Sequence, residues 1–200
     1  MTYAWSARLL VQSLAFAMTF ALAFPANAYD VPMSESSIRD AYFLGSRTGG
    51  LNLEFVSRYA LSIPELKQGN CTSDVRVETP FLQIAKYSSA VPNYSAQDAV
   101  QEFHGKHLTF RLFLDICYET DAPPNSVKFK IIQHKKILDP LSATSTPYAE
   151  PVEDGYLSPN GEQIALEFTA SRIDSSDLTI VIDKPDGQHA ETVFDLQSIR

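Results

Sequence analysis

The chain lacks the short motifs by which many enzymes are recognised. Its 200 residues contain no G-x-S-x-G, no H-E-x-x-H, no phosphate-binding loop and no dinucleotide-binding fingerprint. Positive charge is also scarce, since 16 lysines and arginines stand against 24 acidic residues and give a net charge of −8. Because nucleic acid and anionic lipid would be repelled over most of such a surface, neither is an expected partner. The sequence therefore favours a non-enzymatic protein without a cofactor.

Long apolar runs are absent apart from one at the beginning of the chain. Residues 1–28 carry Arg8 as their only charge, an apolar stretch over 9–24, and the small-x-small pattern Ala26-Asn27-Ala28. These features predict a signal peptide over 1–28 and a mature protein that is periplasmic or extracellular. An uncleaved anchor is the alternative, because the apolar stretch is only slightly shorter than the roughly 17 residues that span a bilayer.

Cysteine is rare, and Cys71 and Cys117 are the only two. They are too far apart in the chain for a C-x-x-C redox motif. In an exported chain an even count favours a single disulfide between them, which would stabilise the fold by about 4 kcal/mol in the chain-entropy model. The alternative is a reactive thiol near His104 or His107.

Apolar residues at helical spacing occur in two parts of the chain. Residues 34–66 predict a pair of short helices, separated by Gly49-Gly50 and ended by Pro64. A third short helix is expected after Ser95, which can act as its N-cap, and Gly105 suits its end. These segments predict a helical unit over 29–70 and one further helix inside the remaining domain.

Alternation of apolar and polar residues predicts about seven strands in residues 71–200. The clearest run extends over 108–118 and is expected to be a central core strand; shorter runs occur at 75–77, 82–84, 127–131, 164–170, 178–182 and 192–196. Lys184-Pro185-Asp186-Gly187 predicts a hairpin turn, whereas 140–160 shows no clear period. The expected fold is mainly β, an antiparallel β-sandwich of immunoglobulin-like or related topology.

Several segments of the chain resemble a known group of sequences. The segments are Asp40-Ala41-Tyr42-Phe43-Leu44-Gly45, Glu78-Thr79-Pro80-Phe81, Tyr94-Ser95-Ala96-Gln97 and the ending from Pro185-Asp186-Gly187 to Phe194-Asp195-Leu196. They are similar to an uncharacterised family of exported bacterial proteins of acidobacterial type. The resemblance implies a bacterial exported origin and brings no activity, cofactor or catalytic residue with it.

One segment carries positive charge that opposes the charge of the whole chain. Lys128, Lys130, His134 and Lys136 share one parity, so on a single strand they would form a basic stripe. The stripe could hold an anionic glycan, phosphate or an acidic partner. Alternatively, the lysines protect a sheet edge from unwanted pairing.

Two metal hypotheses are weaker than their structural alternatives. His104 and His107 could bind zinc together with Glu102 or His134, but Gly105 is expected to end the helix between them. Loop oxygens could gather around calcium without any fixed ligand spacing; the candidates are Asp121, Glu150, Glu153, Asp154, Asn160, Asp174 and Asp177. We predict histidines at a helix-to-strand junction, solvated acidic loops and no metal site.

These observations favour an exported, non-enzymatic binding or envelope-associated accessory module whose partner is an envelope protein or an anionic glycan. Two alternatives stay open. One is a secreted hydrolase that uses the acidic loop residues, and the other is a purely structural envelope component.

Overall fold

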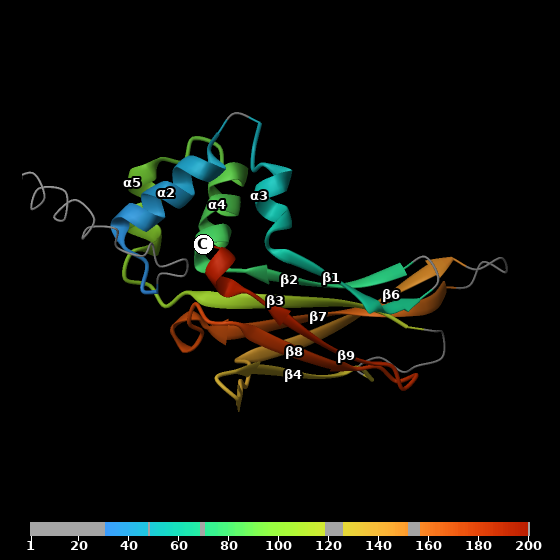
Figure 1. The fold of residues 1–200 in the computed structure, drawn as a ribbon. Helices are drawn as coiled ribbons and strands as arrows, with labels where there is room; N and C mark the ends of the chain where they lie inside the picture. Colours follow the sequence, from blue (N-terminus) through green and yellow to red (C-terminus); the bar gives the residue numbers. More distant parts are fainter. Residues whose placement is uncertain (1–30, 48, 69–70, 119–125, 152–156, 200) are drawn as a thin grey trace, which may run out of the picture.

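The computed structural model describes residues 31–47, 49–68, 71–118, 126–151 and 157–199 (Figure 1). The predicted signal peptide lies outside these residues. None of the helices in the described part of the chain is long and apolar enough to cross a membrane.

Two antiparallel sheets form the body of the molecule (Figure 1). The five-stranded sheet has the order β1-β2-β3-β7-β6 and the four-stranded sheet the order β5-β4-β8-β9. The strands are β1 (Ala60–Gln68), β2 (Cys71–Glu78), β3 (Thr109–Cys117), β4 (Lys128–Gln133), β5 (Lys136–Ile137), β6 (Ser142–Pro151), β7 (Leu157–Thr169), β8 (Leu178–Asp183) and β9 (His189–Phe194). The prediction of antiparallel sheets is confirmed.

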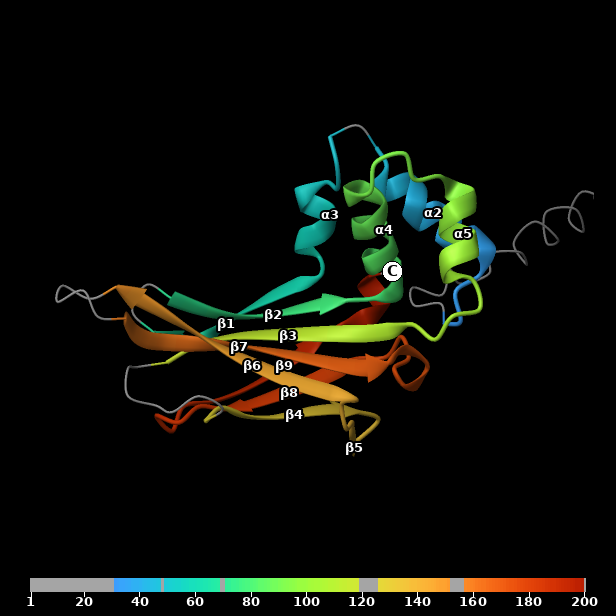
Figure 2. The ribbon, with the colours of Figure 1, turned by 180° about the vertical axis from the view of Figure 1, so that it is seen from behind.

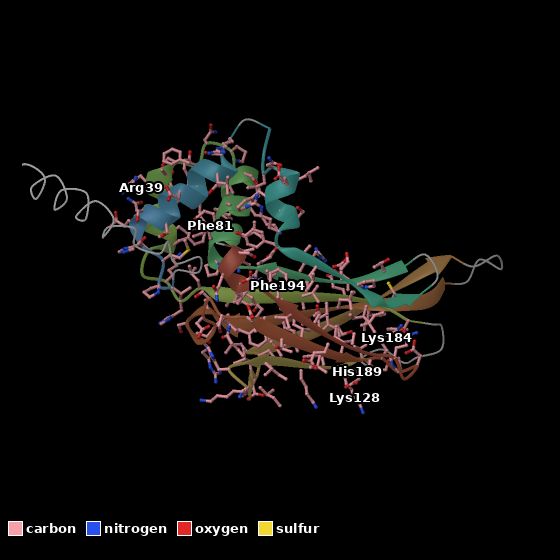
Figure 3. All side chains as sticks on the ribbon, viewed as in Figure 1. Arg39, Phe81, Lys128, Lys184, His189 and Phe194 are labelled. Atoms are coloured by element: carbon pink, nitrogen blue, oxygen red, sulfur yellow. The ribbon has the colours of Figure 1, made fainter. Side chains whose placement is uncertain are left out.

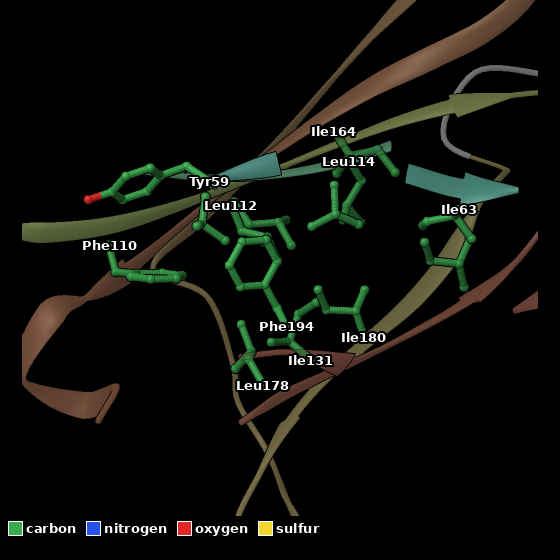
Figure 4. Close-up of a cluster of buried hydrophobic side chains, with 14 of the residues drawn as sticks. Tyr59, Ile63, Phe110, Leu112, Leu114, Ile131, Ile164, Leu178, Ile180 and Phe194 are labelled. Atoms are coloured by element: carbon green, nitrogen blue, oxygen red, sulfur yellow. The ribbon is translucent and has the colours of Figure 1, made fainter. Parts of the chain in front are cut away.

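Strand β3 is central to the five-stranded sheet, as its alternation predicts. Leu112, Leu114 and Ile116 are fully buried, while the residues between them are half-buried on the other face. Figure 4 shows the inward side chains of this sheet meeting Leu178 and Ile180 of the four-stranded sheet. Burial of large aliphatic side chains between the sheets, worth about 1.5–3 kcal/mol each, holds the two layers together.

Four helices in the described residues form a layer of their own. They are α2 (Glu35–Gly45), α3 (Leu53–Ser57), α4 (Pro80–Ala90) and α5 (Ala96–Phe103). Figures 1 and 2 show this layer over one end of the five-stranded sheet, on the side away from the four-stranded sheet. It has a small core of its own, made of Met33, Ile38, Ala41, Phe81, Ile84, Ala99 and Val100. The fold is therefore mixed α/β rather than mainly β.

The predicted third helix is confirmed together with its ends. Ser95 and Asp98 form a reciprocal capping box at the start of α5. Gly105 follows the helix with φ of 74°, a left-handed conformation that favours glycine. The predicted turn between β8 and β9 is confirmed as well, since Gly187 donates its N–H to the carbonyl oxygen of Lys184 at 3.1 Å.

The strand predicted at 82–84 is wrong. These residues lie in α4, where Thr79 caps the helix and Pro80 occupies its first turn. Leu82 and Ile84 are both buried because α4 packs against other parts of the protein on two sides. A helix packed in this way can show the same two-residue apolar pattern as a strand. Proline at the first helical position was the stronger signal, because its missing N–H has no partner there in any case.

Two edge strands were missed. The predicted second helix does not continue to Pro64, because α3 ends at Ser57 and β1 carries Pro64 in an edge strand. The region 140–160, predicted to lack a period, instead contains β6 and the start of β7. Both missed strands contain proline, which a sheet edge tolerates because one side of the strand needs no ladder hydrogen bonds.

Candidate functional site

The residues predicted as a basic stripe lie along β4 and the hairpin that joins β4 to β5. Lys128 and Lys130 are exposed, whereas Ile131, the residue after Lys130, is buried in the core. The two lysines therefore share the outer face of the four-stranded sheet. Figure 3 shows Lys128 near His189 at one end of this face.

The stripe does not continue straight along one strand. His134 and Lys135 have φ of 51° and 62°, and Gln133 pairs with Lys136, so a two-residue turn reverses the chain. Cross-strand partners point to the same side of a sheet, which puts Lys136 on the side of the buried Gln133 and Ile137 on the side of Lys130. The structure thus brings the basic groups to one sheet edge, though not to one face. We call Lys128, Lys130, His134, Lys135 and Lys136 the basic edge.

The lysines of the basic edge have no ion pair among the described residues. Lys128 faces Asp183 in register, but Asp183 is within 2.6 Å of Nδ1 of His189 instead. The acidic groups of this face lie on β8 and β9, so its charge changes from basic at β4 to acidic at the far edge. Ile137 and Val193, which are 60% and 51% exposed, add apolar surface near the turn.

His134 is the one member of the basic edge with an acidic partner in the structure. Its Nε2 lies 2.5 Å from Oδ2 of Asp174 and 3.1 Å from Oγ of Ser176. Burial acts to raise the pKa of Asp174, but hydrogen bonds from Ser176 and His134 outweigh it and hold the pKa below its usual value. The pair fastens the β4–β5 turn to the loop before β8.

The contact of Ser176, His134 and Asp174 is not a catalytic triad. In a triad the base accepts the serine proton on one ring nitrogen while the acid orients the other. Here the hydroxyl and the carboxylate both contact Nε2, and the hydroxyl donates to Oδ1 of Asp174 at 2.5 Å. The hydroxyl proton is held by the carboxylate, so this arrangement does not activate Ser176 as a nucleophile.

The other sequence candidates are not gathered into a site. His104 and His107 are exposed beyond the end of α5, and Glu102 accepts a hydrogen bond from the hydroxyl of Tyr94 instead. Within the described residues no group of three His, Cys, Asp or Glu side chains could hold a metal ion. The remaining calcium candidates lie outside the described residues or have side chains outside them; they are Asp121, Glu150, Glu153, Asp154 and Asn160. Asp177 is exposed before β8.

The structure describes the side chain of only one of the two cysteines in the predicted disulfide. Cys117 is 1% exposed at the end of β3, and its N–H donates to Oγ of Ser73 at 3.0 Å. Ser73 in turn donates to the carbonyl oxygen of Leu66 at 2.8 Å, which fixes β1, β2 and β3 at this point. The side chain of Cys71, two residues before Ser73, lies outside the described part, so the bridge stays a prediction.

A charged network that the sequence patterns did not predict lies on the outer face of the five-stranded sheet. Arg76 donates to Oδ2 of Asp115 from Nε at 3.0 Å and from Nη2 at 2.5 Å, and Gln163 donates to Oδ1 at 2.7 Å. Asp74 pairs with Asp115 in register. Burial and the charge of Asp115 raise the pKa of Asp74, against the opposing effect of Arg76. The polar positions that alternate with the core residues of β3 were the available signal.

Comparison with protein-family models, curated proteins and solved structures finds no match for this chain. The interpretation of the site therefore depends on its own geometry.

Proposed function

We propose that the protein is an exported binding module of a bacterial envelope, and that the basic edge holds an anionic partner, either an anionic glycan or the acidic surface of an envelope protein. The observation that carries the proposal is a set of exposed lysines that have no ion pair within the described part of the chain, on a protein of net charge −8. Such lysines contribute little to stability but keep their charge available to a partner.

The surroundings of the lysines support binding rather than chemistry. The outer sheet face presents Lys130 beside Val181 in register, and Ile137 and Val193 add exposed apolar area. An exposed face of this kind offers contact area and charge, whereas catalysis needs a nucleophile and a base in productive contact. The resemblance to exported bacterial proteins fits the same proposal.

The test is binding to polygalacturonate, an anionic polysaccharide, with neutral dextran as its uncharged counterpart. We expect Lys128→Gln/Lys130→Gln to weaken polygalacturonate binding about tenfold at low salt, because two exposed charges contribute about 1.4 kcal/mol together. The difference should shrink as salt rises. The matched control is Lys106→Gln/Arg172→Gln, which removes the same charge from two other exposed positions.

Three outcomes would contradict binding of an anion by the basic edge. Equal binding of dextran would show that charge is not recognised, and equal weakening by the control would show that only net charge matters. Unchanged binding together with aggregation of Lys128→Gln/Lys130→Gln would show that the lysines protect the open edge of β4.

Export and the disulfide can be tested in one measurement. If residues 1–28 are removed and the two cysteines are joined after export, the periplasmic protein should begin at Tyr29 and carry no free thiol. Mass spectrometry of the unfolded, unreduced and alkylated protein reads both properties. Two alkylated cysteines would exclude the bridge, and an intact Met1 in the membrane fraction would identify an uncleaved anchor.

A further inference from the structure

A groove between α2 and α3 is the second surface on which positive charge gathers. Phe43 and Leu44 of α2 line one wall, followed by Arg47 just beyond the helix, and Phe55 and Arg58 line the other. Phe81, at the start of α4, closes the bottom. The cavity has a volume of about 430 Å³. It belongs to the helical layer and shares no residue with the basic edge.

Both walls of the groove combine an aromatic ring with an arginine. Phe43 lies in the last turn of α2 and Arg47 follows two residues after the helix ends. Phe55 lies in α3 and Arg58 is the residue that caps the end of this helix, three positions later, a spacing at which side chains are neighbours on a helix. The end of α2 and helix α3 thus contribute to one groove.

The apolar part of the groove is left open. Phe81 is 8% exposed, but Phe43 above it is 57% exposed, which is unusual for so large an apolar ring. Phe55 is half-buried and packs against the ring of Tyr59 at a centroid distance of 5.3 Å. An apolar ligand that entered the groove would cover Phe43 and gain the free energy of burying that area.

Both guanidinium groups are available to a ligand. Among the described residues Arg47 has no ion pair, and Arg58 lies 3.7 Å from Glu54 with both side chains more than half exposed. Asp40 is the single acidic residue on the walls. Because the chain as a whole is acidic, two arginines beside an apolar floor select for an anion that carries an apolar part.

The size of the groove decides between a small ligand and a helix. Helix α3 has only five residues, so its wall is about 8 Å long. A helix that docks through anchors at i, i+4 and i+7 needs a longer groove than this wall provides. A single alkyl chain of modest length fits the same space, with its end group between the arginines.

We propose that this groove binds a single-chain alkyl carboxylate, with the alkyl chain on Phe43, Phe55 and Phe81 and the carboxylate between Arg47 and Arg58. A planar guanidinium matches the two oxygens of a carboxylate, which gives the headgroup its selectivity. The site is independent of the basic edge, so either proposal can fail while the other stands.

The test is calorimetric titration of the mature protein with decanoate, 1-decanol and decyltrimethylammonium, all below micelle formation. Decanoate should bind at least tenfold more tightly than the alcohol and the cation. Arg47→Gln/Arg58→Gln should remove this preference but leave the weak binding of decanol unchanged. Phe43→Ser should weaken decanoate and decanol alike, because it removes part of the apolar floor.

The matched control is Arg39→Gln/Arg172→Gln, which removes the same net charge. Arg39 lies on α2 outside the groove, where it donates to Gln97 at 3.2 Å (Figure 3). The control should bind decanoate as the wild type does. The proposal is wrong if decanoate does not bind, if decanol binds equally well, or if the control loses as much affinity as the groove variant. Thermal melting of each variant verifies that the comparison is made between folded proteins.

Discussion

The outer faces of the two sheets differ in whether their lysine and arginine side chains have acidic partners. On the five-stranded sheet Arg76 bonds Asp115, and Arg111 donates to Glu167 at 2.9 Å. Lys86, from α4 above this sheet, pairs with Glu78. On the four-stranded sheet the lysines of β4 have no such partners among the described residues. The five-stranded face bonds its charges within the fold, whereas on the four-stranded face Asp183 pairs with His189 and the lysines of β4 are exposed to solvent.

The difference separates charges that stabilise the fold from charges that are available for the proposed binding. Charges that are hydrogen-bonded and partly shielded from water contribute to the stability of the folded state. Lysines on an exposed face contribute little to stability, so on an acidic protein their charge is available for another role. Helices also cover one end of the five-stranded face, whereas no helix lies over the outer face of the four-stranded sheet in the described part of the chain (Figure 2).

The largest effect on stability is expected at the contact between helices α2 and α4. A Cβ at Gly45 of α2 would lie 2.0 Å from the carbonyl oxygen of Ala85 in α4, a backbone atom that cannot move away alone. We expect Gly45→Ala to lower the free energy of unfolding by about 3 kcal/mol, measured by urea denaturation. Ser46→Ala, at the exposed next position, is the control and should change it little. A mild effect of Gly45→Ala would mean that α2 shifts easily against α4 within the helical layer.

A smaller loss of stability is expected from breaking the bonds of Asp115 on the outer face of the five-stranded sheet. Asp115 is 20% exposed and accepts three hydrogen bonds, two from Arg76 and one from Gln163. Asp115→Asn should cost about 1–2 kcal/mol, because it removes the charge that Arg76 bonds. Lys128→Gln/Lys130→Gln should stay within about 0.5 kcal/mol of the wild type. If both variants change the free energy of unfolding equally, the two faces do not differ in the way proposed.

Much of the sheet architecture could be predicted because buried strands leave a long alternating pattern. The first eight residues of β3, from Thr109 to Ile116, alternate without interruption, which no helix reproduces. Edge strand β6 has no such pattern, since Ser142, Thr144 and Thr146 are exposed and so is Ala143 between them. A strand that buries little leaves no periodic signal. Its two prolines, Pro147 and Pro151, add a feature that is more typical of loops.

The candidate site was predicted in part for a similar reason. Alternation placed Lys128 and Lys130 correctly on one face of β4. The turn after Gln133 was missed because two-residue turns with positive φ are usually formed by Asn-Gly or Asp-Gly, and here His134 and Lys135 adopt them. Contacts between distant segments, such as the pair of His134 with Asp174, leave no local pattern in the sequence at all.

The smallest predicted effect is a gain of stability. It distinguishes Asp74 from Asp115, the two neighbouring carboxylates on the outer face of the five-stranded sheet. Burial, and then the charge of Asp115, raise the pKa of Asp74 above its usual 3.8. The folded state therefore holds the Asp74 proton more tightly than the unfolded state, so the contribution of Asp74 to stability falls as pH rises from about 3.8 through the raised pKa. Asn at this position cannot ionise. Asp74→Asn should match the wild type near pH 3 and exceed its free energy of unfolding at pH 7, by less than about 1 kcal/mol because the side chain is 38% exposed and lies 3.6 Å from Arg76. Urea denaturation at several pH values measures this difference. A variant less stable than the wild type at pH 7 would show that the ion pair with Arg76 outweighs the repulsion from Asp115.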